Sequence, residues 1–175
     1  MSLCVLAYPV MSANDYARIQ EFRSGNDELY YHVVEPHVSL VFPWPDWTPE
    51  PFVAEIKKQV RGFQPFDFCI RSAALDWDSF IDCYHAFLVP DEGHSQIIKL
   101  HDRLYADQLF PQRALTVDFI PHIGVGNSKD ALRCIEMVES WNKDEFAIPG
   151  RISMLDIVNY EGDTLQTIER VALGG

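Results

Sequence analysis

The chain has 175 residues, of which 47% are hydrophobic and 13% aromatic, so its composition supports a folded domain with a sizeable core and excludes a disordered chain. Its 26 acidic and 14 basic residues give a formal net charge of −12, which argues against binding of long nucleic acid because that binding depends on phosphate neutralisation. We interpret the acidic composition as a contribution to solubility. It does not exclude binding of a small phosphate ester through a few specific contacts.

The first third of the chain is predicted to alternate strands and helices. Residues 3–10 are predicted to form a buried strand, and Ser12 is suited to cap a helix over residues 12–22. A second strand is predicted over residues 37–42. It is followed by a helix over residues 51–61 with apolar side chains on one face.

The middle of the chain is predicted to form a hairpin and then a helix. The two strands of the hairpin cover residues 66–77 and 80–89, and the helix covers residues 93–109. We expect these elements to complete a first half of the molecule around the strand at residues 37–42.

The last third is predicted to carry one strand over residues 115–125, a helix that begins at Asn127, and a final hairpin. The two hairpin strands cover residues 152–160 and 165–173, with a turn at Gly162-Asp163. No low-complexity linker divides these elements. The pattern therefore predicts a single domain, residues 1–175, of mixed α+β class.

The cysteine pattern and the apolar segments bear on the cellular compartment in which the protein is expected to fold. No Cys-x-x-Cys pair is present, and every cysteine lies in an apolar segment, as expected for reduced, buried thiols in a cytoplasmic protein. The cysteines are Cys4, Cys69, Cys83 and Cys134. The apolar start of the chain lacks a basic region and a cleavage site and is predicted to be a strand, and no segment is predicted to span a membrane.

Two short stretches share one pattern of proline, histidine, apolar, small and apolar residues. They are Pro36-His37-Val38-Ser39-Leu40 and Pro121-His122-Ile123-Gly124-Val125. Residues two apart share one face of a strand, so His37 and Ser39 point one way, and His122 and Gly124 do the same in the second copy. The apolar neighbours then point into a core. The histidines lie 85 positions apart, and we expect both to face one cleft.

Two histidines facing one substrate suit phosphodiester chemistry. Histidine has an unperturbed pKa of roughly 6.5 and exchanges protons near neutrality. A neutral imidazole can deprotonate a nucleophile while an imidazolium protonates a leaving oxygen. The hydroxyl of Ser39 can also donate a hydrogen bond to a non-bridging phosphate oxygen. A single Pro-His strand is more often structural, and the repeat is what favours catalysis.

The duplicated His-x-Ser/Thr-x motif, at this separation and in a chain of this size, resembles that of the 2H phosphoesterases, which include the 2′-5′ RNA ligase-like proteins and cyclic phosphodiesterases. The first motif is intact, whereas Gly124 departs from the second because it lacks the hydroxyl. The resemblance covers nearly the whole chain. It implies a bilobal α+β fold with pseudo-twofold symmetry, an antiparallel-rich sheet in each lobe, helices outside and a cleft between the lobes.

The resemblance also implies roles for the four motif residues. His122 would be the general base and His37 the general acid, although the reverse reaction exchanges these roles. Ser39 and Gly124 would contact the substrate. The implied activity is metal-independent hydrolysis of a small cyclic or RNA-terminal phosphodiester (2′,3′-cyclic or 2′-5′). We expect the protein to use no cofactor and to be a monomer.

The other histidines and the aromatic residues receive structural interpretations. His85 is predicted to be a core histidine, whereas His94 and His101 are predicted to lie on the surface. A zinc site with His37 and His122 is disfavoured because no His-x-x-x-His or Cys/His cluster supports it. Candidates for stacking on a nucleobase are Trp44, Tyr84 and Tyr160, although core packing is the commoner role.

Two other functions stay open. The alternative hypothesis, based on the missing hydroxyl at residue 124, is a catalytically weakened or inactive protein that binds a nucleotide or a phosphorylated ligand in the same cleft. The third possibility is a structural interaction domain with an acidic surface. Histidines that lie far apart, or a histidine buried in a core, would favour this third possibility.

Overall fold

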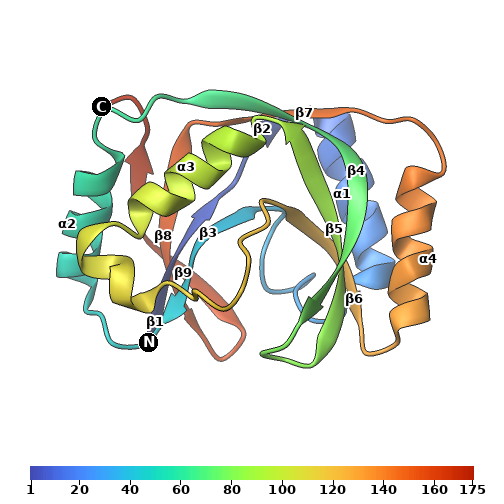
Figure 1. Ribbon diagram of the computed structural model, residues 1–175, viewed down its shortest axis with the longest axis horizontal. Coiled ribbons are helices and arrows are strands. Elements are labelled where there is room, and N and C mark those ends of the chain that lie inside the picture. The colour runs from blue at the N-terminus through green and yellow to red at the C-terminus, as the bar shows by residue number, and fades with distance from the viewer.

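The strands of the computed structural model, which describes residues 1–175, form two antiparallel sheets (Figure 1). In the order of their pairing, the first sheet contains β3 (Val38–Trp44), β1 (Ser2–Ala7), β8 (Met154–Glu161) and β9 (Thr164–Ala172). The second contains β2 (Val10–Met11), β7 (Ile148–Ile152), β4 (Phe66–Asp78), β5 (Cys83–Glu92) and β6 (Ile123–Ser128). The two motif strands, β3 and β6, each lie at the edge of a sheet.

Four α-helices cover the outer faces of the sheets (Figure 1). They are α1 (Ala13–Asn26), α2 (Pro49–Val60), α3 (His94–Leu104) and α4 (Ala131–Asn142). Helices α2 and α3 pack on the first sheet, and α1 and α4 on the second. The predicted α+β fold, with an antiparallel sheet and outer helices in each lobe, is confirmed.

The lobes are not the two halves of the sequence. The first sheet joins the N-terminal β1 to the C-terminal β8 and β9, whereas the β4–β5 hairpin pairs with β6 in the second sheet. The expectation that this hairpin belongs to a first half around residues 37–42 is therefore wrong. Local patterning does not reveal which strands pair across long separations. A single cluster of 32 buried apolar residues includes side chains from both sheets and all four helices.

Several predicted boundaries also need correction. The predicted helix over residues 93–109 is two elements, because α3 ends at Leu104 and a separate 3-10 helix covers Asp107–Gln112. The predicted strand over 115–125 starts only at Ile123, and Asn127 lies in this strand. The next helix is capped instead by Asp130, whose side chain accepts a hydrogen bond from the Leu132 N–H.

The turn chemistry was predicted more accurately. Ser12 caps α1 by accepting a hydrogen bond from the Asp15 N–H at 3.1 Å. Gly162 and Asp163 both have positive φ in the turn between β8 and β9, as two-residue hairpin turns require. Strand β7 is absent from the prediction because Pro149 and Gly150, two residue types that are uncommon inside strands, lie within it. A Cβ at Gly150 would lie 2.4 Å from the Phe68 ring, so glycine permits this strand to pack closely.

Replacing Gly93 by alanine is expected to destabilise the fold by about 2–5 kcal/mol. Gly93 begins α3 with φ +76°, where a side chain costs about 1–2 kcal/mol. Its Cβ would also lie 2.5 Å from Phe68 Cβ and 2.6 Å from the Asp67 carbonyl oxygen, which adds an overpacking cost of about 1–3 kcal/mol. Gly62 has the same φ but open space around it, so Gly62→Ala is the matched control. Urea unfolding that shows equal losses for the two variants would contradict this prediction.

Candidate active site

The first motif alternates between the core and the protein surface. Val38 and Leu40 are buried, whereas His37 and Ser39 on the other face are only partly covered. The His37 Nε2 atom lies 3.1 Å from the Ser39 Oγ atom, and its Nδ1 atom lies 2.8 Å from the Glu35 carbonyl oxygen. The side chains of His37 and Ser39 therefore point to the same side of the strand, as predicted.

The second motif repeats this arrangement. Ile123 and Val125 are fully buried, and His122 and Gly124 are partly covered. The His122 Nδ1 atom lies 2.6 Å from the carbonyl oxygen of Ile120. A Cβ built on Gly124 would have no atom within 4 Å, so this glycine borders open space.

The backbone fixes the tautomer of both histidines. In each motif, Nδ1 faces the carbonyl oxygen two residues earlier, and a carbonyl oxygen only accepts. The neutral ring therefore carries its proton on Nδ1 and presents the lone pair of Nε2. At His37 this lone pair accepts a hydrogen bond from the Ser39 hydroxyl. Both Nε2 atoms are thus available to take up a proton.

Both imidazoles favour the neutral form. Burial among protein atoms lowers the pKa of His37 to about 4, and the bond to the Glu35 carbonyl only partly offsets this. Burial likewise lowers the pKa of His122 to about 4, and a positive charge on His37 lowers it further. The two rings are therefore close enough to interact electrostatically. In Figure 1, β3 and β6 begin near each other at the centre of the molecule.

Aromatic rings contact both histidines. Phe87 of β5 stacks on His122 with ring centroids 3.5 Å apart and planes 13° apart, and the His85 ring stacks on Phe87 with centroids 5.5 Å apart. The Tyr8 ring lies 6.1 Å from His37. His122 is therefore stacked face to face on its aromatic neighbour, whereas the ring beside His37 is tilted and farther away.

A buried polar network ties the two motifs together. Arg23 of α1 pairs with Asp27 at 2.9 Å and donates to the carbonyl oxygens of Tyr30 and Val34, in the segment that leads to His37. The Asn127 Nδ2 atom, on the strand that follows His122, donates to Asp27 Oδ1 at 2.5 Å. The segment before one histidine is therefore anchored to the strand after the other.

The sequence from residue 9 to residue 164 matches the model of a known protein family, the 2′-5′ RNA ligase superfamily. The chain belongs to the 2′-5′ RNA ligase superfamily. This match confirms the expected kinship with the 2H phosphoesterases. A comparison with curated proteins finds no match.

Solved structures share the superfamily fold over the whole chain. TT0787 of Thermus thermophilus has a TM-score of 0.66 at 14% identity and covers 100% of this chain and 99% of its own. LigT of Escherichia coli, complexed with 3′-AMP, has a TM-score of 0.60 at 12% identity, with coverage of 99% and 98%. Usb1 of Kluyveromyces marxianus has a TM-score of 0.57 at 8% identity, with coverage of 95% and 97%. At these identities the likeness shows the fold alone.

His85 and His101 lie outside the two motifs, and the burial predicted from the sequence is right for one and wrong for the other. His85 is buried as predicted, and its Nε2 atom has no hydrogen-bond partner in the protein. His101 is also buried, so its predicted surface position is wrong. Its Nδ1 atom bonds to the Leu40 carbonyl at 2.9 Å and its ring stacks on Phe119 at 3.6 Å. His101 thus braces α3 against the first motif strand, a tertiary contact that helical periodicity alone did not indicate.

The aromatic residues singled out from the sequence make other contacts. Trp44 is exposed at the end of β3, Tyr84 packs on Trp77 with ring centroids 4.5 Å apart, and the Tyr160 hydroxyl donates to Asp163. The rings that contact the motif histidines are Tyr8 and Phe87 instead. The contact of Phe87 could have been anticipated from the sequence, because the alternation of β5 places Phe87 on the same face as His85. No sequence pattern indicated the position of Tyr8.

No group of three or more histidine, cysteine, aspartate or glutamate side chains could hold a metal ion. None of the helices has the length and hydropathy needed to cross a bilayer.

Proposed function

We propose that this member of the superfamily is a phosphoesterase that hydrolyses a small cyclic or RNA-terminal phosphodiester, either 2′,3′-cyclic or 2′-5′, with His37 and His122 as general acid and base. The observation that carries the proposal is the pair of imidazoles, each anchored through Nδ1 to a backbone carbonyl and each offering Nε2. Such anchoring holds proton-transfer groups in the orientation that catalysis needs.

In the proposed reaction, Nε2 of His122 takes a proton from water as the water oxygen attacks phosphorus. The bond from phosphorus to the leaving ribose oxygen breaks, and His37 gives its Nε2 proton to that oxygen. His37 must therefore bind substrate as the imidazolium, which the negative charge of the phosphodiester favours. When His37 is protonated, the Ser39 hydroxyl no longer donates to it and becomes free to donate to a phosphate oxygen.

The proposed substrate is small for two reasons. The chain carries a formal net charge of −12, which opposes an extended polyanion. LigT of Escherichia coli, whose fold this chain shares, was crystallised with 3′-AMP, ATP, NADP+ and phosphate. We further propose that the protein acts as one domain and as a monomer in the cytoplasm. Its four cysteines are all buried and unpaired, as suits a reducing compartment.

The test of this proposal is hydrolysis of a panel of 2′,3′-cyclic nucleotides and 2′-5′ dinucleotides, with and without EDTA. We expect at least one member of the panel to be cleaved at the same rate under both conditions, because the proposed chemistry uses only protein side chains. Cleavage that EDTA abolishes would contradict the metal-independent mechanism, and an inert wild type would contradict the assigned substrate class.

The pH dependence of kcat/KM follows from the two lowered pKa values. This ratio reports the free enzyme, in which both histidines have a pKa of about 4. The protonated fraction of the acid therefore falls about tenfold per pH unit above pH 5. We expect log kcat/KM to fall with a slope near −1 between about pH 5.5 and 8. A flat profile over this range, with the fold checked by circular dichroism, would argue against the two-histidine mechanism.

Gly124 supports a second candidate function. The superfamily motif carries a hydroxyl where this chain has glycine, and open space surrounds the position. A chain that lacks this donor can retain the site and bind a nucleotide or phosphorylated ligand without turning it over. In that case, 3′-AMP would bind with measurable affinity while no phosphodiester of the panel is cleaved.

A further inference from the structure

A groove lies between helices α1 and α4, on the outer face of the second sheet. In Figure 1 both helices lie on the side of this sheet that faces away from the first sheet. The groove has a volume of about 220 Å³. Its lining comes from both helices and consists of Arg18, Glu21 and Phe22 of α1 and Ser140 and Trp141 of α4.

The groove is separate from the site of the two motifs. Gly126 of β6 faces α4, because a Cβ there would lie 2.6 Å from Met137 Sδ. Gly126 pairs with Ala86 of β5, whereas the adjacent Phe87 stacks on His122. Adjacent residues of a strand point to opposite faces. Helix α4 and His122 therefore lie on opposite faces of the second sheet.

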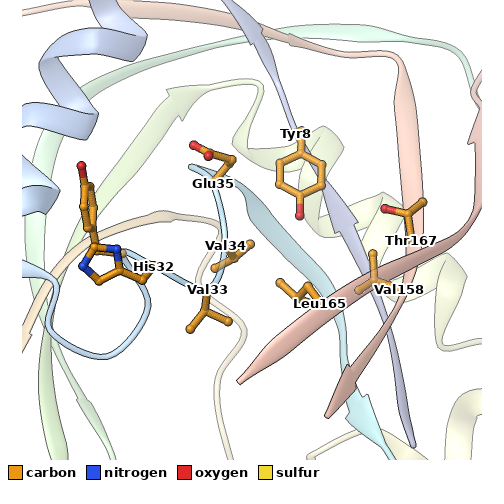
Figure 2. A pocket seen from close by; sticks show the side chains of 9 residues that line it. Tyr8, His32, Val33, Val34, Glu35, Val158, Leu165 and Thr167 are labelled. Atoms are coloured by element: carbon orange, nitrogen blue, oxygen red, sulfur yellow. The ribbon is translucent and has the colours of Figure 1, made fainter. Parts of the chain in front are cut away.

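Another hollow of the same volume differs from the groove in its position. Its lining includes Tyr8 and residues 31–35, and Figure 2 shows the Tyr8 hydroxyl directed toward Leu165. Because the Tyr8 ring lies 6.1 Å from that of His37, this hollow belongs to the surroundings of the first motif. The groove between α1 and α4, by contrast, has no role in the proposed reaction.

The lining of the groove presents a cation without an acidic partner. The Arg18 Cζ atom lies 4.4 Å from the centroid of the Trp141 ring and 5.4 Å from that of Phe146, so cation–π contacts position the guanidinium. The guanidinium makes no ion pair or hydrogen bond within the protein. Its donors form a fork that matches the two oxygens of a carboxylate.

Two further donors of the lining are also unused. The Trp141 indole is 2% exposed, and its Nε1–H has no hydrogen-bond partner, which is unfavourable for a buried donor. The Ser140 hydroxyl, one residue earlier, is exposed and bonds to no protein group. These donors suit a ligand that carries acceptor oxygens.

An unpaired carboxylate and an apolar surface complete the lining. Glu21 lies one turn after Arg18 on α1, and its exposed side chain forms no ion pair. The two opposite charges do not pair with each other, so each can bind a group of a ligand. Phe22 packs on Trp141 with ring centroids 5.3 Å apart. The groove thus combines one cation, one anion and two aromatic rings.

We propose that this groove binds a free α-amino acid with an apolar side chain. The carboxylate of the amino acid pairs with Arg18, its ammonium group pairs with Glu21, and its side chain packs on Phe22 and Trp141. The volume of about 220 Å³ lies below the roughly 300–1,000 Å³ of pockets for drug-sized ligands, as suits a ligand of this size.

The test is titration of L-phenylalanine, N-acetyl-L-phenylalanine and L-phenylalanine amide into the protein, followed through the tryptophan indole N–H resonances. The N-acetyl compound lacks the ammonium group, and the amide lacks the carboxylate. We expect L-phenylalanine to bind most tightly and to shift the Trp141 resonance, which is identified by its absence in Trp141→Phe. His37→Ala should bind L-phenylalanine with unchanged affinity, because the motif cleft is not involved.

Two variants separate the two charges of the ligand. Arg18→Gln should weaken binding of L-phenylalanine and of the N-acetyl compound by about fivefold, the upper range for an exposed ion pair, and leave the amide unaffected. Glu21→Gln should weaken binding of L-phenylalanine and of the amide and leave the N-acetyl compound unaffected. Both side chains are exposed, so we expect both variants to fold.

Lys129→Gln and Glu136→Gln are the matched controls, because they make the same changes of charge at exposed positions outside the groove. They should leave all three affinities unchanged. The proposal would be overturned if L-phenylalanine shows no saturable binding, or if the control variants weaken it as much as Arg18→Gln and Glu21→Gln do. Loss of binding in His37→Ala would place the ligand in the motif cleft and would overturn it as well.

Discussion

Replacing either His37 or His122 by alanine is expected to lower kcat for the best phosphodiester by a factor of about 10²–10⁴, the usual contribution of a positioned acid or base. Each imidazole is anchored through Nδ1 and offers Nε2 to the site, so alanine removes the proton-transfer group altogether. The double variant should fall little further than the worse single variant, because groups that act in one proton transfer are not additive.

His94→Ala is the matched control for these losses. His94 is partly covered at the start of α3 and belongs to neither motif, so its removal should leave kcat unchanged. Steady-state kinetics, with circular dichroism to check folding, provides the measurement. If folded His37→Ala or His122→Ala retained more than about a tenth of the wild-type kcat, the acid–base assignment would be untenable.

Replacing Gly124 by threonine or serine is expected to raise kcat by about a hundredfold. A single preorganised donor to a developing oxyanion contributes about 10²–10³ in kcat, and the second motif lacks one. The substitution should be tolerated, because a Cβ at Gly124 meets no atom within 4 Å. The new hydroxyl would lie on the same face of β6 as His122, as Ser39 does relative to His37.

Gly126→Ser is the control for a nonspecific effect of a hydroxyl on β6. A Cβ at Gly126 would lie 2.6 Å from Met137 Sδ and 3.2 Å from the Asn26 carbonyl oxygen, so this variant should lose stability without gaining activity. A folded Gly124→Thr protein that is no faster than wild type would show that glycine is not what limits the rate. If neither protein has activity, the binding function is favoured.

The parts of this site that could be predicted depend on the short-range periodicity of a strand. Because the side-chain period is two, burial of Val38 placed His37 and Ser39 together on the other face, and the same argument held for His122 and Gly124. The turn at Gly162-Asp163 was predictable for a similar reason, since both residues adopt positive φ readily.

The rest depends on contacts between residues far apart in the chain. The pairing of β1 with β8 and the burial of His101 against Leu40 are set by tertiary packing, which local patterns do not encode. The same is true of the network between Arg23, Asp27 and Asn127, because Arg23 and Asp27 look like an ordinary exposed helix pair in the sequence. The position of Tyr8 beside His37 also follows only from the fold.

The most direct test of the two-histidine mechanism compares two leaving groups. A p-nitrophenyl phosphodiester of a nucleoside releases a stable phenolate and needs no general acid, whereas a 2′,3′-cyclic nucleotide releases a ribose oxygen that does. We predict that His37→Ala recovers most of its lost kcat on the p-nitrophenyl ester and that His122→Ala stays impaired on both substrates. Equal losses for both variants on both substrates would contradict the division of the two histidines into acid and base.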